Sequence, residues 1–353
     1  MGSEVTGLGD AAAVGWERVD CDLHNEVPRI ESLLPYLSEH WVEQVKTTVF
    51  RGAPDTAYPP ALFREPAMPA DPLARLREEV LDRDRVTAGI LNCTYAVDSL
   101  HNPDQAAAMA RAVNDWQSAE WLACDRRLRA SIVVPSQVPA LAVEEIERVA
   151  GRPGFVQVLL PARAHHPYGS RLFHPLWEAI AAHGLVAGIH FGGAPGNPPT
   201  PVGWPSYHYE TYVGMALAFA AQLSSLVSEG VFDLHPDLRV TLIESGFTWL
   251  PSHLWRFDKE WKNLRRLVPW VRRPPSDYVR RHVRLTVQPL DAPGDPRQLL
   301  ELVDQLESDE MLLYASDYPH RHAGDVEADL LRHLPPALAE RVCSANAREW
   351  YRL

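Results

Sequence analysis

The chain alternates short runs of β-branched residues with longer segments of helical periodicity, and it does so eight times. Helical spacing of apolar residues is clear in segments such as 103–123, 138–151 and 174–184. Eight βα units in 353 residues close most simply into one parallel barrel, so we predict the α/β class and a (β/α)8 TIM barrel with long βα loops. The predicted strands are 17–24, 85–95, 128–135, 154–161, 184–191, 238–245, 283–289 and 311–319.

Two connections are longer than a minimal barrel requires. Residues 25–84 are rich in proline and aromatic residues and have weak periodicity, so we predict an irregular excursion over the barrel mouth. Residues 192–230 combine a proline-rich loop with an apolar helix predicted over 211–230, and such loops usually shape a substrate pocket. Because barrels of this length are commonly single units, we expect residues 1–353 to form one domain.

Charge and cysteine content restrict the compartment and the class of partner. The net charge of −12 argues against nucleic acid, which needs a basic surface. The four cysteines form no Cys-x-x-Cys pair, which argues against a disulfide framework or a zinc knuckle. The chain starts without a signal-peptide pattern, and no segment approaches the roughly 18 apolar residues expected of a membrane span. We therefore expect a cytoplasmic protein with neither nucleic acid nor membrane as a partner.

Side chains that can bind metal stand at the ends of four predicted strands. Asp22 and His24 are two residues apart in the first run, so both can project from one face of that strand. His190 ends the fifth run, Glu244 the sixth and Asp317 the eighth, and barrel enzymes bring such strand ends together. Any one of them could instead be a hydrogen-bonded structural residue or a helix N-cap. A buried group of this size needs charge compensation, and a divalent ion supplies it most simply.

The order of motifs resembles a known superfamily over nearly the whole chain. The motifs VDCDLHN, GIHFGG, HPDLRVTLIESGFTWLP and YASDYPH resemble the amidohydrolase superfamily, in the branch of aminocarboxymuconate-semialdehyde decarboxylase and γ-resorcylate decarboxylase. By this resemblance, Asp22 and His24 take the place of a first-strand His-x-His pair. His190 and Asp317 then take the places of the fifth-strand and eighth-strand ligands. The resemblance also implies a homodimer.

Two positions depart from the pattern of that branch. Asp22 stands where the first histidine of the pair is expected, and Glu244 stands where the sixth strand often carries a histidine. Both changes replace a neutral nitrogen donor with a charged oxygen donor, which shifts the expected metal from zinc towards iron or manganese. The missing histidine also calls for another ligand or acid–base group, and the candidates are Glu26, His165, His166 and His320.

The carboxylate-rich set makes an oxidative reaction the leading hypothesis. Mixed carboxylate and imidazole ligands around two irons are how dinuclear non-heme proteins activate dioxygen. The Asp-x-His variant also resembles the amidohydrolase-fold diiron monooxygenases of the platensimycin and platencin pathways. We therefore predict an oxidoreductase that uses two iron ions and dioxygen to hydroxylate an unactivated carbon of a hydrophobic, diterpenoid-like natural-product intermediate. The alternative is a non-oxidative decarboxylase or hydrolase with one zinc or manganese ion, in which Glu244 or His320 moves the proton.

Aromatic residues near the predicted mouth suggest a pocket for a hydrophobic small molecule. Trp204, Tyr207, Tyr209 and Tyr212 could roof a large apolar ligand, or they could pack the loop onto the barrel or form a dimer interface. The remaining pocket candidates, which follow the sixth strand, are His253 and Trp255.

A basic segment follows these candidates. Residues 251–284 contain ten arginines or lysines against three acidic residues. They could receive an anionic handle of the substrate, such as the phosphates of coenzyme A, or they could form a solvated helix face.

Overall fold

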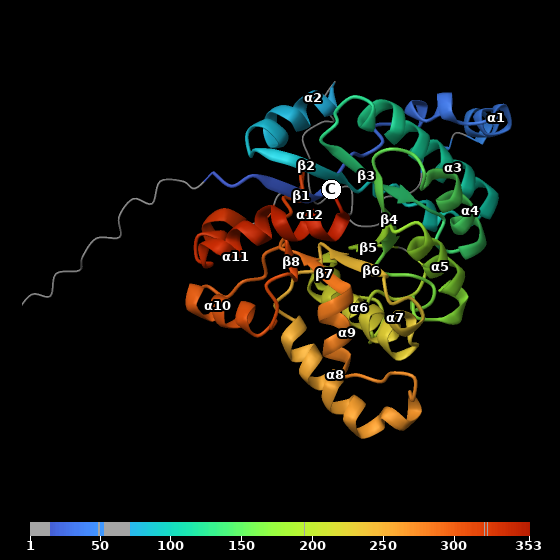
Figure 1. The fold of residues 1–353 in the computed structure, drawn as a ribbon. Helices are drawn as coiled ribbons and strands as arrows, with labels where there is room; N and C mark the ends of the chain where they lie inside the picture. Colours follow the sequence, from blue (N-terminus) through green and yellow to red (C-terminus); the bar gives the residue numbers. More distant parts are fainter. Residues whose placement is uncertain (1–14, 49, 53–70, 194, 321, 323) are drawn as a thin grey trace, which may run out of the picture.

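Eight parallel strands occupy the centre of the molecule (Figure 1). The computed structural model describes residues 15–353 except 49, 53–70, 194, 321 and 323. Neighbouring strands pair in chain order from first to last. They are β1 (Arg18–Leu23), β2 (Val86–Leu91), β3 (Leu128–Val133), β4 (Phe155–Pro161), β5 (Val186–His190), β6 (Arg239–Ile243), β7 (Val283–Thr286) and β8 (Leu312–Leu313).

The first and last strands meet and close the sheet. The Cys21 backbone N–H donates to the Tyr314 carbonyl at 3.0 Å, and that of His24 donates to the Tyr318 carbonyl at 2.8 Å. Leu23 and Tyr318 also form a parallel bridge. The predicted (β/α)8 barrel is therefore confirmed.

Helices surround the barrel and connect its strands (Figure 1). Several begin at a proline, whose fixed φ suits the first helical turn and whose missing N–H costs nothing there. At the start of α3, the Asn102 side chain also accepts hydrogen bonds from the backbone N–H groups of Asp104 and Gln105. The helices are α1 (Glu39–Thr48), α2 (Pro72–Leu76), α3 (Pro103–Gln117), α4 (Pro139–Val149), α5 (His174–Ala182), α6 (His208–Ser228), α7 (Val231–Leu234), α8 (Leu250–Leu264), α9 (Pro275–His282), α10 (Pro296–Asp304), α11 (Pro336–Glu340) and α12 (Asn346–Tyr351).

The long first connection is more regular than its sequence suggested. Among its described residues it contains α1, α2 and short 3-10 and π turns, while residues 53–70 of the predicted excursion lie outside the described part. The apolar face of this connection explains the difference, since Leu33, Val45 and Leu76 are buried in the main core.

The helix α12 closes the amino-terminal end of the barrel. The Arg239 guanidinium, at the start of β6, donates to the Trp350 carbonyl, and the Arg348 guanidinium donates to the Thr87 hydroxyl near the start of β2 at 2.6 Å. Trp350 and Tyr351 also belong to the small apolar cluster inside the barrel, together with Cys21 of β1. The opposite, carboxyl-terminal end of the strands is therefore the end at which a site can open.

The helix α6 packs against the barrel through one face only. Phe219, Leu223 and Leu226 are buried, whereas Val213 and Leu217 are 66% and 56% exposed. With a mean hydropathy of 1.3 over 18 residues, α6 is long and apolar enough to cross a membrane. The expectation that no segment reaches this length was therefore wrong, although core helices of other proteins pass the same test.

This arrangement predicts unequal costs for two truncations within α6. Phe219→Ala should lower the free energy of unfolding by about 3–5 kcal/mol, because it opens a cavity against the barrel. Leu217→Ala should change it by less than about 1 kcal/mol, because that side chain is largely in solvent. Urea denaturation followed by circular dichroism measures both. Equal losses would mean that the buried face of α6 is assigned incorrectly.

Candidate metal centre

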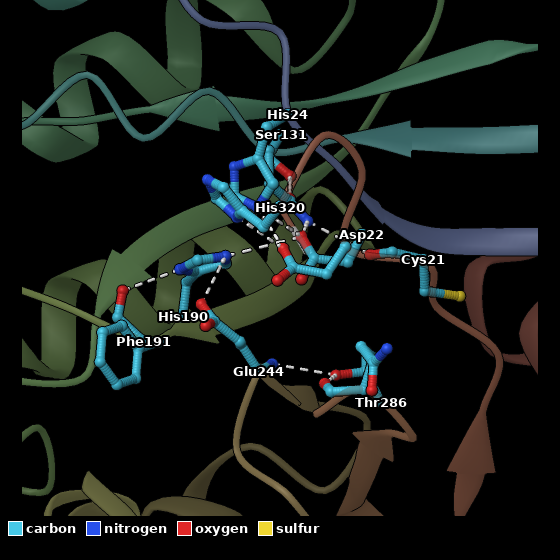
Figure 2. A network of polar contacts seen from close by, with 12 residues as sticks. Cys21, Asp22, His24, Ser131, His190, Phe191, Glu244, Thr286 and His320 are labelled. Atoms are coloured by element: carbon cyan, nitrogen blue, oxygen red, sulfur yellow. Dashed lines mark hydrogen bonds and ion pairs between the residues drawn. The ribbon is translucent and has the colours of Figure 1, made fainter. Parts of the chain in front are cut away.

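Three buried side chains converge at the carboxyl-terminal end of the barrel (Figure 2). Asp22 and His24 come from the end of β1, and His190 is the last residue of β5. One ligand atom from each lies within 4.8 Å of those of the other two. Asp22 Oδ1 is 3.4 Å from His24 Nε2 and 3.5 Å from His190 Nε2. This is the spacing of side chains that can share one ion.

Asp317, beyond β8, stands at the centre of a second group that shares His24. Its Oδ1 lies 2.8 Å from His24 Nε2 and 3.0 Å from His320 Nδ1, and its Oδ2 lies 2.5 Å from His322 Nε2. Burial alone would raise the pKa of Asp317, but the hydrogen bonds from these three imidazoles hold it well below its usual range. Asp317 is therefore ionised.

Glu244 approaches the same group from the end of β6. Its Oε2 lies 3.9 Å from His190 Nε2, and its backbone N–H donates to the Thr286 hydroxyl of β7 at 2.9 Å. Burial, followed by the negative charge of Asp317, raises the pKa of Glu244 to about 8. Burial lowers the pKa of His190, but the carboxylates of Asp22 and Glu244 outweigh it and raise that pKa to about 9.

The backbone at two of these positions is in the left-handed region. Glu244 has a φ of 57° and Asp317 a φ of 58°. Residues other than glycine rarely adopt this conformation, which costs on the order of 1–3 kcal/mol unless the surroundings impose it. Glu244 directly follows the end of β6, and its carboxylate points towards His190 (Figure 2), whereas Asp317 lies four positions beyond the end of β8.

The donor set fits a divalent cation. His190 Nδ1 lies 2.8 Å from the Phe191 carbonyl, which can only accept, so Nδ1 keeps its hydrogen and Nε2 is the atom that offers a lone pair once the ring loses its second proton. Within the described part of the chain, neither His190 Nε2 nor Asp22 Oδ2 has a hydrogen-bond partner, although both are buried. A cation bound between them would use both atoms and would offset the buried negative charge.

The other predicted ligands and acid–base groups are distributed unequally. His320 lies within the Asp317 group. Glu26 is half-buried beyond β1 and belongs to neither group of metal-competent side chains. His165 and His166 are exposed and line a small pocket beside Arg163.

A cavity beside His190 is formed by the ends of β2, β3, β4 and β5. Its lining includes Tyr95, Asp98, Val133, Leu159 and Phe191. Its wall is therefore mainly apolar, with a few polar groups from the segment after β2. A small, flat ligand in it would contact His190 directly.

None of the four aromatic residues predicted to roof the pocket lines this cavity. Tyr212 packs on Phe191 with ring centroids 4.9 Å apart, so it contacts a residue of the cavity wall without lining the cavity itself. Trp204, Tyr207 and Tyr209 are 70%, 73% and 75% exposed and do not line the cavity, because they precede or begin α6 on its solvent side.

The two candidates on α8 also lie away from the cavity. Trp255 is exposed, and His253 is half-buried between Trp249 and Phe257. Neither lines the cavity beside His190.

Sequence reasoning did not assign two residues that contact the centre. His322 follows His320 by two positions, and this His-x-His spacing was a usable signal. Asn92 donates to Asp22 Oδ1 at 2.8 Å, but a single asparagine after a strand carries no recognisable pattern.

Comparisons with known proteins give a consistent picture. The family model described as Amidohydrolase matches residues 19–353. A gamma-resorcylate decarboxylase of Rhodococcus jostii (strain RHA1) is 26% identical over 266 residues, which cover 69% of this chain and 76% of that protein. The 5-carboxyvanillate decarboxylase LigW of Sphingomonas paucimobilis has a similar structure, with a TM-score of 0.70 and 22% identity over 96% of this chain and 99% of that chain.

A further solved structure contains a metal ion. It is a dihydroxybenzoic acid decarboxylase of Polaromonas sp. JS666 with bound manganese and the inhibitor 2-nitroresorcinol. It aligns with a TM-score of 0.67 and 21% identity, over 96% of this chain and 97% of that chain. At these identities the two solved structures show a shared fold.

These findings correct the predicted activity. The prediction of an oxidoreductase, a diiron monooxygenase that hydroxylates a diterpenoid-like compound, is wrong, because the sequence relatives that match 69–78% of the chain are gamma-resorcylate decarboxylases. The error came from interpreting a carboxylate-rich donor set, with Asp22 and Glu244 in place of histidines, as evidence for two irons and dioxygen. Carboxylates and imidazoles also suit a single hard divalent ion, which needs no dioxygen. The resemblance to the decarboxylase branch is confirmed, whereas the resemblance to the platensimycin and platencin enzymes is not.

The raised pKa values predict how the stability of the metal-free protein depends on pH. The protonated forms of His190 and Glu244 favour the fold, so their contributions are lost as the pH rises through about 9 and about 8. The free energy of unfolding should therefore fall with pH, most steeply between pH 6.5 and 8, where both groups contribute. Mn²⁺ competes with the proton on His190, so the stabilisation that it gives should grow over the same range.

Urea denaturation at pH 6.5, 8 and 9, with and without saturating Mn²⁺, measures this dependence. The control is Glu244→Gln, which cannot ionise and should make the fall shallower. A metal-free stability that stays constant or rises with pH would contradict the assigned protonation states.

Proposed function

Because this chain belongs to the amidohydrolase family, we propose that it is a metal-dependent decarboxylase that removes carbon dioxide from a hydroxylated aromatic acid. The observation that carries the proposal is the convergence of Asp22, His24 and His190 at the carboxyl-terminal end of the barrel. Their position beside a mainly apolar cavity suits a small, flat acid. The relatives named for the decarboxylation of such acids support this substrate class.

Four side chains would hold one divalent ion. These are Asp22, His24, His190 and Asp317, and manganese is the ion that we favour, because two carboxylates and two imidazoles form a relatively hard donor set. The neighbour with bound manganese supports this assignment. Iron and zinc are the competing ions, and metal replacement separates the three.

Glu244 would be the proton donor in this scheme. In the metal-free protein, burial raises its pKa to about 8, so it carries a proton at neutral pH. Its position 3.9 Å from His190 Nε2 places that proton beside the proposed ligands. Glu244 would therefore take the acid role in place of the histidine expected in the sixth strand, and His320 would support Asp317.

The reaction exchanges one carboxylate for one proton. When bound, the divalent ion would supply positive charge that orients the oxygen atoms of the acid. The carbon–carbon bond between the ring and the carboxylate breaks, its electron pair remains on the ring carbon, and the Glu244 carboxyl proton bonds to that carbon. Carbon dioxide leaves, and the Glu244 carboxylate takes up a proton from solvent. Val133, Leu159 and Phe191 would exclude water from the ring during this exchange.

The predictions of a coenzyme A handle, a homodimer and a cytoplasmic location remain predictions. An aromatic acid is the small-molecule partner, and a coenzyme A handle is not needed to account for the basic segment 251–284. Two of its arginines, Arg280 and Arg284, already pair with Glu307 and Glu310. The homodimer and the cytoplasmic location are compatible with the proposed reaction.

A direct assay tests the activity. Protein loaded with Mn²⁺ and incubated under argon with 2,6-dihydroxybenzoate or 5-carboxyvanillate should release carbon dioxide, because no step consumes dioxygen. Treatment with a chelator should abolish the release, and added Mn²⁺ should restore it. Failure to decarboxylate any of a panel of hydroxybenzoic acids with manganese, iron or zinc would refute the proposal. Hydrolysis of an ester or amide by the same protein would then favour a hydrolase.

The role of Glu244 has its own test. Glu244→Gln keeps the shape of the side chain but removes its proton, so kcat should fall by about 10²–10⁴-fold. Mn²⁺ should still bind to the variant, since the four proposed ligands are unchanged. The matched control is Glu229→Gln, an exposed carboxylate at the end of α6 and away from the cavity, which should keep kcat within about twofold. If Glu244→Gln retains full kcat, the proton comes from another group.

A further inference from the structure

The buried side-chain amide of Asn92 donates a hydrogen bond to the Asp22 carboxylate from the interior of the barrel. Asn92 Nδ2 donates to Asp22 Oδ1 at 2.8 Å and also lies 3.2 Å from the Cys21 carbonyl. The orientation of the amide is fixed, because its oxygen would repel the carboxylate if the two ends were exchanged. Asn92 Oδ1 must therefore point away from the metal centre, towards the interior of the barrel.

The interior supplies donors for that oxygen. The Ser131 hydroxyl donates to Asn92 Oδ1 at 2.6 Å, and Gln157 Nε2 donates to it at 3.0 Å. All three side chains are fully buried. Because Gln157 uses its nitrogen here, its oxygen must face the amino-terminal end of the barrel, where the Tyr351 hydroxyl lies 2.8 Å away.

The chain of hydrogen bonds ends in α12. Gln157 Oε1 can only accept, so the single hydroxyl hydrogen of Tyr351 is donated to it. Tyr351 Oη also lies 3.0 Å from Thr241 Oγ1, and the Thr241 hydroxyl must then donate to it. The Trp350 indole N–H donates in turn to Thr241 Oγ1 at 3.0 Å. Indole is only a donor and carboxylate only an acceptor, so every hydrogen in the chain points towards Asp22.

We infer that α12 positions the Asp22 carboxylate through this chain, and that Tyr351 is a positioning residue for metal binding. Its members, in order, are Trp350, Thr241, Tyr351, Gln157, Asn92 and Asp22. Hydrogen bonds that point in one direction polarise and strengthen one another in a dry interior. The chain fixes Asp22 Oδ1 and so determines how the carboxylate faces His24 and His190.

The inference rests on the proposed function only in assuming that Asp22 binds a divalent ion. It requires no particular substrate and no decarboxylation. The effect of each residue on metal affinity should decrease with the number of hydrogen bonds that separate it from Asp22. Removing Asn92, which touches a proposed ligand, should cost the most affinity, and removing the Tyr351 hydroxyl should cost less but a measurable amount.

Titration with Mn²⁺, followed by the electron paramagnetic resonance signal of the free ion, tests the inference. Tyr351→Phe deletes one hydroxyl and should raise the Kd for Mn²⁺ about three- to tenfold, and Asn92→Ala should raise it about 10- to 100-fold. The isosteric Thr241→Val provides a second conservative variant and should weaken binding in the same direction. The matched control is Tyr278→Phe, since the Tyr278 hydroxyl donates to Asp233 on the outside of the barrel, and its Kd should stay within about twofold of the wild type.

A double-mutant cycle distinguishes positioning from general destabilisation. If Tyr351 acts through Asn92, adding Tyr351→Phe to Asn92→Ala should not raise the Kd further. Additive losses, an unchanged Kd in Tyr351→Phe, an equal loss in Tyr278→Phe, or a wild-type protein that binds no Mn²⁺ would each overturn the inference. If Tyr351→Phe and Asn92→Ala are coupled in this way but the protein releases no carbon dioxide, only the proposed function is refuted.

Discussion

Three carboxylates, Asp22, Glu244 and Asp317, are buried close together at the mouth of one barrel, and this crowding of like charge is the constraint on which the site depends. No apolar packing can stabilise it, because each ionised group has lost most of its hydration. The structure offsets it in three ways. Imidazoles surround Asp317, a proton remains on Glu244, and an amide donates to Asp22. Asp22 Oδ2 and His190 Nε2, which have no hydrogen-bond partner among the described residues, are the atoms that a cation would contact.

The fold was predictable because it depends on local patterns that repeat. All eight runs contain a strand, and the helical segments between them occupy the expected places. The first connection was harder to predict, since α1 has a weakly apolar sequence and is held by a few buried contacts such as that of Val45. Such a helix is stabilised by distant parts of the chain, which no window of sequence contains.

The site was predictable in its positions and not in its chemistry. Strand ends converge by geometry, so His190 and Asp317 could be placed near Asp22 without a structure. Whether a carboxylate such as Glu244 bridges two metals or holds a proton depends on its burial and its neighbours, and the sequence contains neither. The interior amides were not predicted for a related reason, because single residues such as Asn92 after β2 and Gln157 within β4 form no periodic pattern.

The position of α12 at the closed end of the barrel has a consequence for how the protein is made. The proposed ligands are spread from Asp22 to Asp317, and the helix that completes the interior contacts follows them all in the chain. The first strands therefore emerge from the ribosome well before α12, which positions Asp22 in the proposed centre, has been synthesised. Tight binding of an ion would therefore require the chain to be synthesised and folded through α12.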